Sequence, residues 1–347
     1  MSGPGALGRR ALLGGLALAT IQPPRAHAAD EALVAAARRE GTVVWYSSLV
    51  EAQASRPLVA AFERRYPGIR VQLVAGTSND LLTKLLTEQR AGSLRGDVHH
   101  GGSAVWPLIQ AGAVEPYAAP SAAAYPTSLR DPEDRWTAQL LSFLVPAVNT
   151  DLVPAARAPK SFDELLDPRW RGKIAWTTQM TQGGAPGFIG TVLADRGEEA
   201  GMEFLRKLAA QRLVNVPANQ RVVLNNVISG EYPIALATFN YHSAISAKDG
   251  APVRALPLDP VTGTLDTIFL LKGPNRNAGK LFVDYTLSEE GQTVFRRAGY
   301  VPAHPRIDAE IRELKPEGGG FRAVYLTPQI VEANMRRWIA IYNELFR

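Results

Sequence analysis

The sequence has 347 residues, enough for about two domains, and its 46% hydrophobic and 20% charged content excludes an intrinsically disordered chain. Its net charge of +5 includes three arginines within residues 1–28, so the remainder is too weakly basic to indicate nucleic-acid binding. The absence of cysteine excludes disulfides, thiolate metal sites, cysteine nucleophiles and a lipid-bearing N-terminal cysteine.

The N-terminus has the pattern of an export signal. Arg9 and Arg10 precede a short Gly/Ala-rich apolar run, and Ala26-His27-Ala28 fits the small-x-small cleavage pattern. The paired arginines predict a twin-arginine-like signal over residues 1–28, with a Sec-type signal as the alternative. No later segment has about 18 uninterrupted apolar residues, so we expect a soluble, exported protein without a lipid anchor, located in a bacterial periplasm.

The first half of the chain alternates strand and helix. Thr42–Tyr46 is β-branched and aromatic, as a buried strand is, and the following helix has Ser55 as its candidate N-cap. Ile69–Val74 is the next strand, and Ser78 or Asn79 is expected to cap the helix after it. Asp97–His100 is the third strand. This alternation predicts an α/β fold with a mainly parallel sheet.

A long apolar run over Gln139–Val148 is expected to cross into a second lobe, since Pro146 argues against a helix. Strand and helix then alternate again. Ser161–Glu164 has a capping-box pattern that predicts a helix, and Lys173–Trp176 and Ile234–Phe239 are strand-like. Thr267–Leu271 is the expected return to the first lobe.

In both halves, polar or glycine residues stand where a strand ends and a helix begins. In open α/β sheets, ligands bind beyond the carboxyl ends of the strands, and free N–H groups at helix N-termini attract anions. Arg221, at a helix start, is suited to grip a carboxylate or phosphate. We therefore expect a ligand cleft lined by Ser47, Ser48, Ser78, Asn79, Gly102, Ser103, Thr178, Gly183, Gly184, Arg221, Asn240, Tyr241 and His242.

The chain also resembles family 1 extracellular solute-binding proteins of ABC importers, in the branch that binds ferric iron, thiamine or phosphonate-like solutes. The resemblance covers nearly the whole chain after the signal and rests on the order and spacing of individually loose segments. These segments are GTVVWYSSL, YPGIRV, RGDVHHGGSAV, PKSFDELLDPRWRGKIAW, SGEYPIALATFNYH, LSEEGQTVF and GYVPAHP.

The resemblance implies a two-lobe, type II periplasmic-binding fold with the ligand held between the lobes. We expect the first lobe to comprise residues 29–138 and 262–305, and the second lobe 139–261 and 306–347. We further expect a monomer without cofactor or catalytic residues, which captures a small polar solute and delivers it to a membrane permease. The helix N-termini and Arg221 lead us to expect that this solute is an organic anion.

Two alternatives remain open at this point. Ferric-binding relatives have adjacent tyrosines where this chain has Tyr241 and His242, so Tyr241 is the candidate metal ligand if the solute is iron; otherwise no metal site is expected. A periplasmic hydrolase with residues brought together only by the fold is the other alternative, although no GxSxG or HExxH pattern is present. His99 and His100 are adjacent on a strand and point to opposite faces, which argues against a shared metal.

Overall fold

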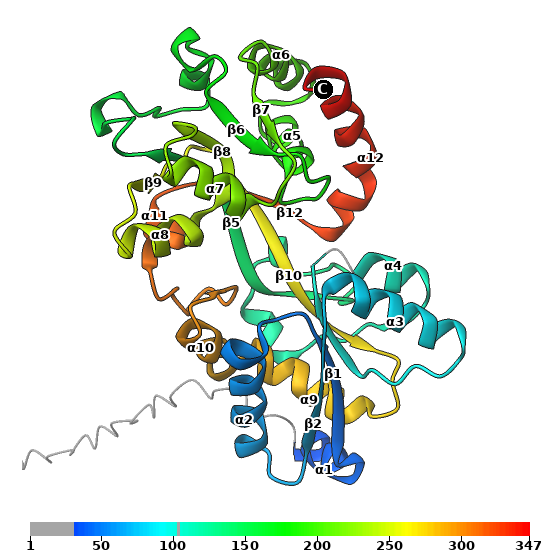
Figure 1. Ribbon diagram of the computed structural model, residues 1–347. Coiled ribbons are helices and arrows are strands. Elements are labelled where there is room, and N and C mark those ends of the chain that lie inside the picture. The colour runs from blue at the N-terminus through cyan, green and yellow to red at the C-terminus, as the bar shows by residue number, and fades with distance from the viewer. Residues whose placement is uncertain (1–30, 103–104) are drawn as a thin grey trace, which may run out of the picture.

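The computed structural model describes residues 31–102 and 105–347; the predicted export signal and Ser103 therefore lie outside the described residues. The chain forms two α/β lobes joined by two long antiparallel strands, β5 (Thr137–Asn149) and β10 (Val261–Leu271), as Figure 1 shows. Strands of both lobes form one continuous path in the order β2-β1-β3-β10-β5-β8-β6-β7. The two-lobe α/β fold expected from the sequence is confirmed.

The first lobe, at the bottom of Figure 1, is built on parallel pairs of β1 with β2 and with β3. The strand β10 continues this sheet in the antiparallel direction. Its strands are β1 (Thr42–Ser47), β2 (Arg70–Ala75), β3 (Val98–Gly101), β4 (Val114–Glu115) and β11 (Val301–Pro302). Its helices are α1 (Glu31–Glu40), α2 (Arg56–Arg65), α3 (Ser78–Arg90), α4 (Val105–Gln110), α9 (Arg276–Leu287) and α10 (Glu289–Arg297).

The second lobe repeats the design, with β6 parallel to both β7 and β8. Its strands are β6 (Ile174–Thr177), β7 (Val214–Val216), β8 (Ile234–Phe239), β9 (Val253–Ala255) and β12 (Ala323–Leu326). Its helices are α5 (Ala185–Arg196), α6 (Glu198–Ala209), α7 (Gln220–Ile228), α8 (Asn240–Lys248), α11 (Pro316–Gly319) and α12 (Pro328–Leu345). The helix expected after Ser161 is only a short 3-10 turn over Asp163–Leu166, although Ser161 Oγ does accept from Glu164 N–H at 3.3 Å.

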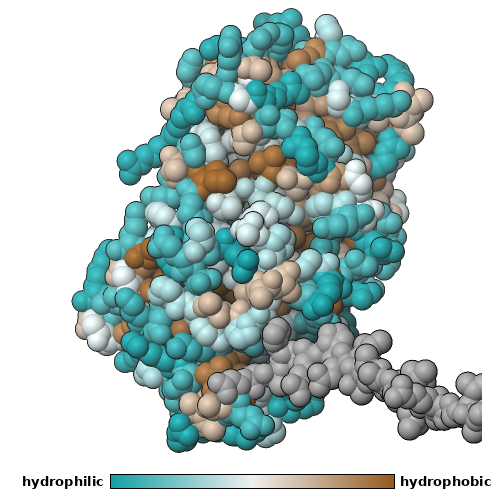
Figure 2. Space-filling model, turned by 180° about the vertical axis from the view of Figure 1, so that it is seen from behind, coloured by the Kyte–Doolittle hydropathy of each residue, from teal (hydrophilic) through white to brown (hydrophobic). Residues whose placement is uncertain are grey.

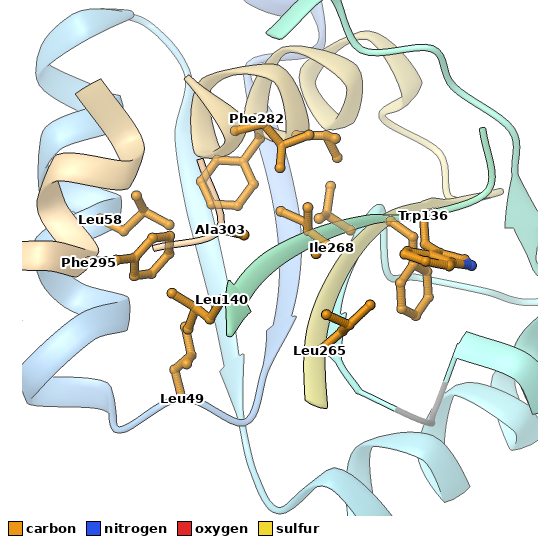
Figure 3. Close-up of a cluster of buried hydrophobic side chains, with 14 of the residues drawn as sticks. Leu49, Leu58, Trp136, Leu140, Leu265, Ile268, Phe282, Phe295 and Ala303 are labelled. Atoms are coloured by element: carbon orange, nitrogen blue, oxygen red, sulfur yellow. The ribbon is translucent and has the colours of Figure 1, made fainter. Parts of the chain in front are cut away.

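Separate hydrophobic cores support the two lobes. The first collects buried residues of 37–145 and 261–321, and the others collect residues of 147–258 and 326–346. Figure 3 shows part of the first core, where Phe282, Leu58 and Phe295 from helices pack near Leu140 and Leu265 from the two connecting strands. The connecting strands are thus anchored in the core itself. The lobe boundaries drawn from the sequence stay a prediction.

The surface opposite the view of Figure 1 is mostly hydrophilic, with hydrophobic residues in small separate patches (Figure 2). Among residues 31–102 and 105–347, no helix combines the length and apolar character needed to cross a bilayer.

Candidate functional site

In the first lobe, hydrogen bonds of the buried Ser47 side chain fix the loop after β1. Ser47 is fully buried; its Oγ lies 3.1 Å from Ser55 Oγ and accepts from Leu49 N–H at 3.3 Å. Leu49 points into the core beside Leu140 (Figure 3). Ser55 therefore braces this loop instead of capping α2, with no side-chain cap bond at the start of that helix. Ser48 is half-buried, and ligand contact by Ser47 or Ser48 stays a prediction.

The second polar loop of this lobe leads into α3. Thr77, one residue before the expected caps, is the N-cap, and its Oγ1 accepts from Asp80 N–H at 3.2 Å. Ser78 and Asn79 are consequently not needed as caps, and both are exposed. Ligand contact by Ser78 or Asn79 stays a prediction.

Gly102, directly after β3, is where the first lobe meets the second lobe and a connecting strand. A β-carbon added there would lie 3.2 Å from Leu265 O, 3.3 Å from Gln182 Nε2 and 3.5 Å from Asp266 Oδ1. Leu265 and Asp266 belong to β10, whereas Gln182 belongs to the loop between β6 and α5. Glycine keeps a narrow space open between three different parts of the fold.

In the second lobe, the starts of α5, α7 and α8 converge. Gln220, the first residue of α7, donates from Nε2 to Gly183 O, just before α5. A β-carbon on Gly183 would lie 3.5 Å from the ring of Phe239, which is the N-cap residue of α8. Thr178 is half-buried nearby, and its N–H donates to Val216 O at 3.0 Å. Three helix N-termini therefore face one region.

Arg221 is the cationic group of this region. Its guanidinium donates to Ser246 Oγ at 3.0 Å, and among the described residues no carboxylate lies within ion-pair distance of it. Burial, and then the positive charge of Arg221, lowers the pKa of His242 to about 4. His242 is therefore neutral at pH 7, and its buried Nδ1 has no partner in the described part of the chain.

Beside this cationic end lies a group of aromatic rings at the start of α8. Phe239 and Tyr241 stack with centroids 5.5 Å apart and planes at 25°. Tyr241 and His242 approach edge to face at 4.3 Å. The consecutive rings of Tyr241 and His242 form a continuous wall, partly exposed, along the site.

Asp266 forms the opposite, acidic end. It lies on β10 where the pairing with β5 shifts register, and within the described chain its carboxylate has no hydrogen bond and no ion pair. Burial raises its pKa to about 6. Burial, and then the charge of Asp266, raises the pKa of Tyr241 to about 12. The pKa of Tyr300 is also raised, mainly by burial and in part by Asp266. Asp266 is thus close enough to both tyrosines for its charge to raise their pKa values.

Comparison with known proteins places this arrangement in a family. The sequence profile of the family described as "Bacterial extracellular solute-binding protein" matches residues 97–318, which is more than half of the chain. The chain belongs to this family. The resemblance to the solute-binding proteins of ABC importers is confirmed.

Solved structures agree on the fold. FutA of Trichodesmium, in complex with iron and citrate, superposes with a TM-score of 0.76 at 17% identity, covering 88% of this chain and 100% of that one. AfuA of Actinobacillus pleuropneumoniae, with fructose-6-phosphate bound, gives a TM-score of 0.66 at 20% identity, covering 88% and 99%. An uncharacterized protein of Haemophilus influenzae is 25% identical over 284 residues, 78% of this chain and 80% of that protein.

Of the other expected site residues, Asn240 has a structural partner in this solute-binding protein. It is buried, and its Nδ2 donates to Leu314 O at 3.0 Å, which ties the start of α8 to the segment after β11. Its Oδ1 has no partner among the described residues. Gln182 and Tyr300 were not expected from the sequence. Gln182 lies in the loop that also contains the predicted site residues Gly183 and Gly184, whereas no local sequence pattern indicated a role for Tyr300.

The adjacent histidines have separate neighbours. Both are buried on opposite faces of β3; His99 Nδ1 lies 2.9 Å from Tyr46 O, and His100 lies beside Gln139. Burial lowers the pKa of each to about 4. Within residues 31–102 and 105–347, no three His, Cys, Asp or Glu side chains gather closely enough to hold a metal ion.

A groove of about 470 Å³ between α2 and β2 is a separate feature of the first lobe. Its apolar lining includes Val59 and Leu73. Its charged groups already have partners, because Arg56 pairs with Glu51 at 2.6 Å and Glu63 accepts from Val71 N–H at 2.9 Å. It offers no unpaired charge to a polar solute, so the region around Arg221 and Asp266 is the better candidate site.

Proposed function

We propose that this protein is the periplasmic solute-binding component of an ABC importer, and that it captures a small organic anion between its lobes without altering it chemically. The closed protein then presents the solute to a membrane permease. The observation that carries the proposal is Arg221: a partly exposed guanidinium, without a carboxylate partner in the described chain, where α5, α7 and α8 begin.

The electrostatics of this region favour an anion. The N-terminus of each helix carries about half a positive charge and presents free N–H groups. The Arg221 guanidinium adds a full charge and can donate two parallel hydrogen bonds to a carboxylate or phosphate. His242 adds no charge at neutral pH, so Arg221 is the principal cation of the site.

A thermal-shift and calorimetry panel tests the proposal. It comprises carboxylates, phosphonates, phosphorylated compounds, polyols, amines and ferric salts. We expect an anion to raise the melting temperature of the wild-type protein and to be recovered unchanged. Arg221→Ala should weaken this anion about 10- to 100-fold, the effect of losing a charge-assisted hydrogen bond.

Arg206→Ala is the matched control, since Arg206 is an exposed arginine on the outer helix α6. The affinity of this variant for the anion should equal that of the wild type. If Arg221→Ala and Ser48→Ala both leave the affinity unchanged, the assignment of the site is wrong. Release of a chemically changed product would favour the hydrolase alternative.

Ferric iron is the second candidate, favoured by one observation: Tyr241, Tyr300 and Asp266 interact closely enough for Asp266 to raise both tyrosine pKa values. Hard cations such as ferric iron prefer oxygen ligands of this kind. The pKa of Tyr241, about 12, keeps the free phenol protonated, so iron would have to displace its proton. Ferric loading should then give a visible charge-transfer band that Tyr241→Phe abolishes. A colourless protein after loading excludes this candidate.

A further inference from the structure

We propose that the solute is two-ended, and that Asp266 selects solutes which carry a protonated amine in addition to the anionic group held by Arg221. This inference rests on the proposed capture of an anion and adds the chemistry of its other end. The solute class is then a small zwitterion, such as an amino-substituted carboxylate or phosphonate.

Asp266 is a carboxylate whose charge the described chain does not compensate. The side-chain amide of Gln182 lies with Asp266 around Gly102. Within the described residues, no lysine or arginine pairs with Asp266 and no backbone N–H donates to it. Buried charges in proteins are normally paired. An unpaired one among the candidate site residues indicates that the missing partner arrives with the ligand.

The walls around Asp266 also suit a cation. The faces of aromatic rings attract ammonium groups, and Tyr241, which stacks on Phe239, is close enough to Asp266 for the carboxylate to raise its pKa. The adjacent His242 is uncharged at pH 7, so it does not compete for Asp266. A neutral hydroxyl could donate a hydrogen bond to Asp266, but it would leave the buried charge uncompensated. An amine satisfies both requirements.

The two ends are linked by consecutive residues. The charge of Asp266 raises the pKa of Tyr241, and the charge of Arg221 lowers the pKa of His242. The rings of Tyr241 and His242 are 4.3 Å apart. A solute lying along these rings can therefore reach the acidic end and the cationic end together. The arrangement distinguishes the two ends, because one end carries the guanidinium of Arg221 and the other the carboxylate of Asp266.

The experiment measures affinity for matched solute pairs by calorimetry. The probes are ω-amino carboxylates and ω-amino phosphonates with chains of about two to six carbons, each paired with its amine-free analogue, together with hexose phosphates and ferric citrate. We expect the wild-type protein to bind the best amino compound at least about tenfold more tightly than its amine-free analogue.

Two variants separate the ends of the site. Asp266→Asn should abolish the preference for the amine while binding of the amine-free anion remains, whereas Arg221→Ala should weaken both members of a pair. Asp249→Asn, at the exposed end of α8, is the control and should keep the wild-type preference. Circular dichroism and the melting temperature verify that each variant is folded.

The inference is overturned if Asp266→Asn keeps the preference, if amine-free anions bind as tightly as their amino partners, or if hexose phosphates bind more tightly than every amino compound. In those cases capture of an anion through Arg221 still stands. If ferric ion alone binds, both the inference and the proposed anion capture fail.

Discussion

Asp266→Asn should stabilise the ligand-free protein, and the stabilisation should depend on pH. The pKa of this carboxyl is raised from 3.8 to about 6 by burial. Between about pH 4 and pH 6, the folded state therefore keeps a proton on Asp266 that the unfolded state has released. Stability due to this proton is fully present below pH 4 and is lost as the pH rises through about 6. At neutral pH the ionised carboxylate destabilises the folded protein.

The size of the effect follows from the pKa difference of about two units. Each unit corresponds to about 1.4 kcal/mol, which gives an upper limit of about 3 kcal/mol. Because Asp266 retains some contact with solvent, we expect about 1–3 kcal/mol at pH 8. The neutral amide of asparagine has nearly the same shape and removes this penalty. At about 2 °C per kcal/mol for a chain of this size, the melting temperature should rise by about 2–6 °C.

The assay is thermal unfolding of the wild type and Asp266→Asn, without ligand, at intervals from pH 4.5 to pH 8. The difference between the two proteins isolates Asp266 from other carboxyls with raised pKa values, such as Asp97. The difference should be small at the acidic end and grow through pH 6. A variant less stable than the wild type at pH 8, or a difference that does not change with pH, would refute the assignment of Asp266 as an unpaired buried carboxyl.

Two further substitutions test the packing that supports the site. Gly190→Ala in α5 would place a β-carbon against the Trp338 ring of α12. We therefore expect the free energy of unfolding, measured in urea, to fall by about 1–3 kcal/mol, although alanine has the higher helix propensity. Adding Trp338→Phe should restore part of this loss. Asp131→Ala removes a buried carboxylate that accepts hydrogen bonds from Arg135 Nε at 2.6 Å and Nη2 at 3.0 Å. The free energy of unfolding should fall by about 3 kcal/mol. A change below about 1 kcal/mol would contradict the structural role of Asp131.

Much of the architecture follows from local patterns. The connecting strand β5 was predicted from the long apolar run over Gln139–Val148, and twelve of the thirteen residues of this strand are buried. Pro146 within it lies at a register shift in its pairing with β8. Strand ends were expected to gather because the carboxyl ends of parallel strands share one edge. The start of α3 was misplaced by one residue, since Thr77, Ser78 and Asn79 are all suitable caps and only the backbone angles select Thr77.

The site was less predictable, for physical reasons. Ser47 has the same strand parity as the buried Val43 and Trp45, but Tyr46 of the opposite parity is buried too, so the apolar run before Ser47 contains no alternation that marks it as pointing inward. Asp266 and Tyr300 come from a connecting strand and from the segment after α10. Their proximity to Tyr241 depends on how the lobes assemble, which sequence spacing does not encode. The unpaired state of Arg221 is likewise visible only once the whole surroundings are in place.

The origin of the site residues also suggests which of them control capture and which control closure. Arg221 belongs to the second lobe and Asp266 to a connecting strand, so together they can hold a solute before the first lobe engages. Binding favours the closed state only through contacts made with both lobes, and Gly102 is a first-lobe residue that closely approaches Gln182 of the second lobe. Gly102→Val would put methyl groups between Gln182 and Asp266. In small-angle scattering at saturating solute, we expect Arg221→Ala to compact as the wild type does and Gly102→Val to remain expanded. If Gly102→Val compacts to the same radius of gyration, closure does not need the space that this glycine keeps open.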